Sequence, residues 1–85
     1  MSVRLEGQVV VLEGDCRIEE AEALLRALQE APGAAVDMAG VRHLHAAVLQ
    51  ILLSLRVPVA SLPEEPLLRD HVGPTLERAL GVAAG

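Results

Sequence analysis

The segment Val9-Val10-Val11-Leu12 constrains the fold of this chain more than any other part of the sequence. A continuous run of β-branched and aliphatic residues is typical of a strand covered on both faces, so we expect it inside a sheet. A helix is predicted over Ile18–Glu30, because apolar residues recur there at helical spacing and Pro32-Gly33 then stops the pattern. A buried strand followed by an amphipathic helix indicates an α/β fold.

The rest of the chain continues this alternation. The predicted strands are Ser2–Glu6, Gln8–Leu12, Ala34–Met38 and Val57–Ser61. Pro58 predicts that the last strand lies at an edge of the sheet, because proline has no N–H to donate to a neighbouring strand. The predicted helices after the first are Ala46–Leu55, one or two helical turns over Leu67–Val72, and a last helix from Pro74 to Leu80. The expected breaks are Glu13-Gly14-Asp15, Ala39-Gly40 and Gly73-Pro74, with Val41–His45 as a connection and Leu62–Pro66 as a loop. We therefore predict one domain over residues 1–85, with a four-stranded mixed sheet and about three helices packed on it.

Composition and charge exclude several classes of function. The chain has no Phe, Trp or Tyr, which removes the aromatic platforms that stack on single-stranded nucleic acid. Its net charge of -5 with scattered arginines predicts no nucleic-acid partner. The longest apolar stretch, Ala46–Leu55, is too short for a membrane helix, so no membrane insertion is expected. We expect a cytoplasmic protein, because Cys16 is the single cysteine and the N-terminal apolar run is too short for a signal peptide. The use of arginine without any lysine favours a bacterial source.

Two segments carry a resemblance to a known family. Residues 14–28 read GDCRIEEAEALLRAL, and residues 36–49 read VDMAGVRHLHAAVL. Both are similar to the STAS domain, the family of sulfate-transporter tails and anti-sigma-factor antagonists. The agreeing positions are Gly14, Ile18, Ala21, Leu24, Ala27 and Leu28 in the first segment, and Val36, Asp37, Gly40, Val41, Leu44 and Leu49 in the second. The resemblance implies a STAS-like α/β fold and a domain that works by binding other proteins.

The chain departs from the family at the residues that form its switch. Family members carry a serine, phosphorylated by a partner kinase, at the start of the second helix, where this chain has Ala46 and Ala47. The acidic residue before them is His45 here, and the acid of the neighbouring loop is Arg17. A methyl group cannot accept a phosphoryl group, so the resemblance implies a scaffold without the usual phosphoswitch.

Serine-less domains of this kind resemble accessory subunits of chemotaxis clusters and of lipid-transport ATPase complexes. We therefore expect a non-enzymatic accessory or adaptor subunit without a cofactor. Its expected partner is a kinase or anti-sigma-like protein, a chemotaxis component or an ABC-transporter component, and self-association stays open. Two alternatives remain: a small-molecule or lipid-binding sensor, and an antagonist phosphorylated at an unusual residue such as His45, Ser54 or Thr75.

The predicted partner-binding residues lie before the second predicted helix, along its exposed side and in the loop after the second strand. They are Asp15, Arg17, His43, His45, Ala46, Ala47, Gln50 and Ser54. Gln50 and Ser54 are four residues apart and are expected to mark the exposed line of the helix, with Leu49 buried on the opposite side.

The other chemically active residues are expected to have structural roles. His43 and His45 lack a third ligand nearby in the sequence, so no metal site is predicted and both are expected to face solvent. We expect Asp37 and Asp15 to cap a turn or a helix, and Cys16 to be buried.

Overall fold

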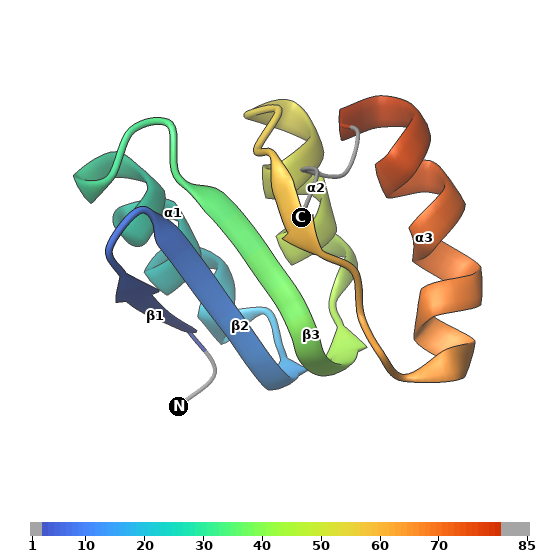
Figure 1. The fold of residues 1–85 in the computed structure, drawn as a ribbon. Helices are drawn as coiled ribbons and strands as arrows, with labels where there is room; N and C mark the ends of the chain where they lie inside the picture. Colours follow the sequence, from blue (N-terminus) through green and yellow to red (C-terminus); the bar gives the residue numbers. More distant parts are fainter. Residues whose placement is uncertain (1–2, 81–85) are drawn as a thin grey trace.

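The computed structural model describes residues 3–80 and confirms the predicted fold class (Figure 1). A four-stranded sheet has the order β1-β2-β3-β4; β2 pairs antiparallel with β1 and parallel with β3, and β3 pairs parallel with β4. The elements are β1 (Val3–Glu6), β2 (Val9–Cys16), α1 (Glu19–Glu30), β3 (Ala35–Leu44), α2 (Ala46–Ser54), β4 (Val59–Ser61) and α3 (Pro66–Leu80).

The order of the strands agrees with what the sequence predicted for the interior and the edge of the sheet. β2 lies between β1 and β3, and its Val10 and Leu12 are fully buried. Gly7, at a φ of 61°, opens the short turn that joins β1 to β2, a left-handed conformation that glycine adopts readily. β4 begins directly after Pro58 and forms one edge of the sheet.

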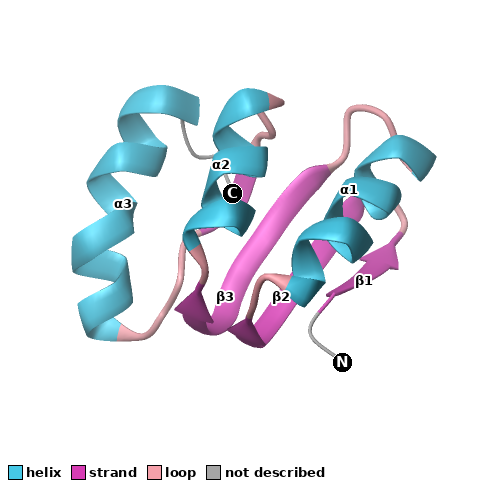
Figure 2. Cartoon of the chain, turned by 180° about the vertical axis from the view of Figure 1, so that it is seen from behind, coloured by secondary structure: helices cyan, strands magenta, loops and turns pink. Residues whose placement is uncertain are grey.

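The core lies between the sheet and the helices α1 and α2, which cover the same face (Figure 2). α3 runs beside α2, next to the edge formed by β4 (Figure 1). The fully buried core side chains include Val10 and Leu12 of β2, Val36 and Met38 of β3, Leu24 of α1, Val48 and Leu52 of α2, and Leu76 of α3.

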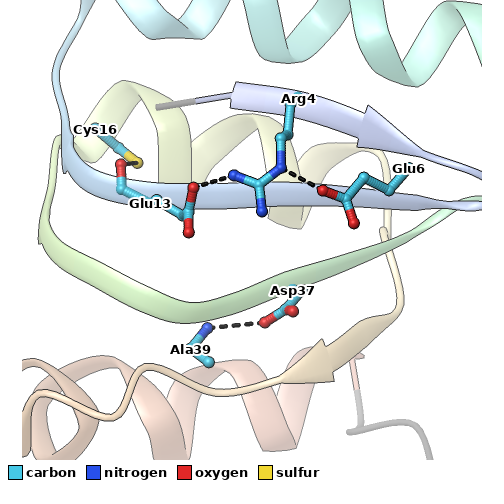
Figure 3. A network of polar contacts seen from close by, with 6 residues as sticks. All are labelled: Arg4, Glu6, Glu13, Cys16, Asp37 and Ala39. Carbon is cyan, nitrogen blue, oxygen red and sulfur yellow. Dashed lines mark hydrogen bonds and ion pairs between the residues drawn. The ribbon is translucent and has the colours of Figure 1, made fainter. Parts of the chain in front are cut away.

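The opposite face of the sheet, here called the uncovered face, has no helix over it in the described part of the chain (Figure 1). β2 is therefore an interior strand of the sheet, but the described helices cover only one of its faces, whereas its apolar run predicts a strand covered on both. Arg4 forms ion pairs on it with Glu6 and Glu13 (Figure 3). The hydrogen bonds that Arg4 donates to the carboxylates of Glu6 and then Glu13 raise the pKa of its guanidinium above the ordinary value. These side chains are exposed, so water screens their attraction and they contribute little to stability.

β2 and β3 are longer than predicted, because the expected breaks are irregularities inside continuous strands. Val11 is opposite Asp37 and Glu13 is opposite Gly40, so β3 contains one more residue than β2 over this stretch. This is the geometry of a β-bulge, which bends a strand without ending it. Gly14 has a φ of 68° and lies at the second such irregularity, so the expected breaker at residues 13–15 is part of β2.

α3 also differs from the prediction. It is one continuous helix, and Pro74 lies inside it instead of opening it. The carboxylate of Glu65 accepts hydrogen bonds from the backbone N–H groups of Leu67 and Leu68, at 3.2 and 2.7 Å, and Pro66 is the first helical residue. A capping acid followed by proline is a strong start for a helix, and this start lies in the segment that was predicted to be a loop.

Two apolar residues are less buried than predicted. Ile18 was expected on the inner stripe of the first helix, but it precedes α1 and is 56 % exposed. Leu49 was expected in the core, whereas it is only partly buried, and Val48 and Leu52 are the side chains of α2 that face the sheet. The short α2 therefore buries a narrower stripe than its composition suggested.

Candidate functional site

Most of the predicted partner-binding residues lie at the carboxyl edge of β2 and β3, where α1 and α2 both begin (Figure 2). Gln50 and Ser54 lie farther along α2, and Ser54 is its last residue. Asp15 is opposite His43 in the parallel pairing. The backbone N–H of His45 donates a hydrogen bond of 2.8 Å to the carbonyl of Cys16, which joins the two strand ends. The two parts of the predicted site, separated by nearly thirty residues in sequence, are thus neighbours in the fold.

His45 starts α2. Its backbone is extended, and its Nδ1 accepts a hydrogen bond of 3.0 Å from the N–H of Ala47. An acceptor at this position satisfies one of the N–H groups that the first turn of a helix leaves without a helical partner. The imidazole must therefore carry no proton on Nδ1 while it caps the helix. His45 is exposed as predicted, and it has a structural role in this position.

We call the surface formed by Asp15, Arg17, His43, His45, Ala46, Ala47, Gln50 and Ser54 the α2 face. All of its residues are exposed except Ala47, which is partly buried. Gln50 and Ser54 lie on the exposed side of α2, as predicted. Arg17 Nη2 lies 3.7 Å from a carboxylate oxygen of Asp15, a long and exposed ion pair.

Ile18 belongs beside the α2 face, although the sequence analysis did not include it. It follows Arg17 directly and leaves a large aliphatic side chain exposed at the edge where α2 starts. The helical spacing between Ile18 and Ala21 predicts that Ile18 lies on the buried side of the helix. In the structure α1 begins at Glu19, so Ile18 lies before the helix and is exposed. Together, the α2 face and the adjoining Ile18 combine small and large apolar groups with polar residues around them.

The two histidines of residues 43–45 have different surroundings. His45 caps α2, whereas His43 lines a cavity of about 550 Å³ together with Arg42 and with His71 of α3. His71 is far from His43 in sequence, so no spacing rule connected them. Among residues 3–80, no three His, Cys, Asp or Glu side chains are grouped closely enough to hold a metal ion.

The remaining polar and thiol groups have packing or turn roles. Asp37 Oδ1 accepts a hydrogen bond of 3.0 Å from the N–H of Ala39, which confirms a turn-capping role, although inside β3 and not at its end (Figure 3). Cys16 is buried as predicted, with Sγ 4.0 Å from the carbonyl oxygen of Glu13 (Figure 3). Asp15 does not cap α1, because the N-cap is Ile18 and that cap has no side-chain hydrogen bond.

Comparison with protein-family models, with curated proteins and with solved structures finds no match to this chain. The STAS resemblance therefore remains a prediction from residues 14–28 and 36–49 of the sequence. None of the helices in residues 3–80 is both long enough and apolar enough to cross a lipid bilayer.

Proposed function

We propose that this chain is a non-catalytic, STAS-like accessory subunit that binds a protein partner through the α2 face. This proposal rests on one observation: the start of α2 and the neighbouring Ile18 are both exposed. Ala46 is exposed in the first turn of α2, and its methyl group leaves the backbone of the helix start accessible to a partner. Ile18 is exposed at the same edge of the sheet.

The chemistry of this surface fits a protein partner. Protein interfaces commonly combine an apolar centre with a polar rim. Here Ile18, Ala46 and Ala47 supply the apolar part, and Arg17 and Gln50 supply hydrogen-bonding groups around it. A contact of this composition needs no phosphorylation to form, so we expect constitutive binding. The partner would be a kinase or anti-sigma-like protein, a chemotaxis component or an ABC-transporter component.

The experiment compares charge substitutions on and off the α2 face. Tagged wild type, Gln50→Arg and Ala46→Arg are used to recover partners from a lysate of the source organism, with Gln29→Arg as the matched control. Gln29 is an exposed glutamine of α1 and does not belong to the α2 face. Circular dichroism verifies that each variant is folded.

We expect one protein to be recovered with the wild type and with Gln29→Arg, and recovered at least about tenfold less with both α2-face variants, a loss typical of a disrupted interface. Equal recovery with all folded variants would show that the partner does not bind the α2 face. If the wild type recovers no protein reproducibly, the accessory-subunit function is wrong.

A further inference from the structure

A second candidate site lies between the carboxyl end of β3 and the first half of α3. It is a cavity of about 550 Å³, within the range of roughly 300–1,000 Å³ found for small-molecule sites. The end of β3 and the start of α3 lie at the same end of the molecule (Figure 1). In α/β proteins, ligands commonly bind outside the carboxyl ends of the parallel strands, which is where this cavity opens.

Three of the four polar residues that line the cavity can donate hydrogen bonds, and the fourth is the carboxylate of Glu65. Arg42 and His43 come from β3, and His71 comes from α3. Adjacent strand residues normally point to opposite faces, but β3 contains an irregularity here: Gly14 is opposite Val41 and Asp15 is opposite His43. Arg42 is therefore the extra residue of a bulge. A bulge re-aims side chains, which explains how Arg42 and His43 both line one cavity.

Arg42 is the group in the cavity that favours an anion. Arg42 forms no ion pair with any residue in the described range 3–80. Glu65 is the one carboxylate lining the cavity among the described residues, and its two oxygens accept hydrogen bonds from the N–H groups of Leu67 and Leu68. Because Glu65 is occupied in capping α3, the guanidinium of Arg42 remains available to an incoming group. It offers planar, paired N–H donors that match a carboxylate.

The remaining walls are aliphatic. Leu44, Leu68 and Val72 line the cavity and are partly buried against the core, and Leu67 is 73 % exposed beside them. The site has one fixed cation, two imidazoles, aliphatic walls and one carboxylate, Glu65, whose oxygens are engaged in capping α3. This lining suits a ligand with a single negative charge and an apolar tail. A phosphate, which carries up to two charges, would find only one fixed cation among these donors.

We propose that this cavity binds an aliphatic carboxylate. Its head group lies on Arg42, assisted by His43 and His71, and its tail lies along Leu44, Leu68 and Val72. This would give the domain a ligand site in addition to protein docking. Arg42 and His71 are not part of the α2 face, so variants at these positions test the cavity separately from the proposed partner contact.

The experiment uses the full chain and sodium octanoate as the probe. Backbone amide NMR maps the site on the wild type, and calorimetry measures affinity for wild type, Arg42→Gln, His71→Ala and the control Arg26→Gln, which changes an exposed arginine of α1. Acetate, octanol and octyl phosphate separate the contributions of tail and head group.

We expect octanoate to shift the amides of residues 42–44 and 65–72. Arg42→Gln should weaken binding by about tenfold or more, as loss of a charge-assisted hydrogen bond does. His71→Ala should weaken binding by a smaller factor, and Arg26→Gln should leave it unchanged. The proposal is overturned if octanoate leaves these amides unshifted, if Arg42→Gln binds as the wild type does, or if octanol or octyl phosphate binds as tightly as octanoate.

Discussion

His45 Nδ1 accepts a hydrogen bond of 3.0 Å from the backbone N–H of Ala47, so a histidine begins the helix on which the proposed docking surface is built. Replacing His45 with Ala removes the acceptor and should lower the free energy of unfolding by about 1 kcal/mol. His45→Asn keeps a side-chain acceptor suited to this position and should be at least as stable as the wild type. Urea denaturation followed by circular dichroism measures both, and an alanine variant as stable as the asparagine variant would show that the cap contributes nothing.

Asp37 stabilises the bulge of β3 by accepting a hydrogen bond of 3.0 Å from the N–H of Ala39, while the carbonyl of Ala39 accepts one from the N–H of Glu64. Asp37→Ala leaves the N–H of Ala39 without this acceptor and should cost about 1–3 kcal/mol of stability. Asp37→Asn keeps the acceptor oxygen and should cost clearly less. Chemical denaturation of the two variants tests this, and equal losses would mean that the carboxylate charge, not the hydrogen bond, matters.

The two neighbours Val48 and Leu49 of α2 should respond differently to the same substitution. Val48 is fully buried, so Val48→Arg places an unpaired charge in the core and should destabilise the domain by about 4 kcal/mol or more. Leu49 is partly buried, so the longer side chain of Leu49→Arg can reach water and the loss should be about 1–2 kcal/mol. Thermal denaturation ranks the two variants, and a larger loss for Leu49→Arg would place Leu49 in the core after all.

Much of the architecture could be predicted because hydrophobic pattern and strand position are closely connected. The run Val9–Leu12 predicted the interior strand, and Pro58 predicted the edge strand. The ends of the elements were harder to predict, because Gly14 and Gly40 can either end a strand or belong to a bulge. Only the pairing of β2 with β3 decides between the two. The position of Pro74 after Gly73 predicts a helix start, but Glu65 and Pro66 already provide one eight residues earlier.

Of the two candidate sites, one could be predicted from the sequence and the other could not. The proximity of residues 15–17 to the start of α2 was implied by the STAS resemblance, and the parallel pairing of β2 with β3 places Asp15 opposite His43. The cavity could not be predicted, because it joins Arg42, which a bulge re-aims, to His71 on a helix whose start was misplaced. Residues connected only by tertiary packing leave no spacing signal in the sequence.

Photo-crosslinking tests most directly whether a partner binds the α2 face. A photoreactive phenylalanine analogue is placed at Gln50 in the full chain, and the same analogue at Gln29 of α1 is the control; both positions are exposed. In living cells of the source organism, we expect Gln50 to give one discrete crosslinked species containing a second protein, and Gln29 to give none. A discrete species from Gln29 with none from Gln50 would contradict docking through the α2 face.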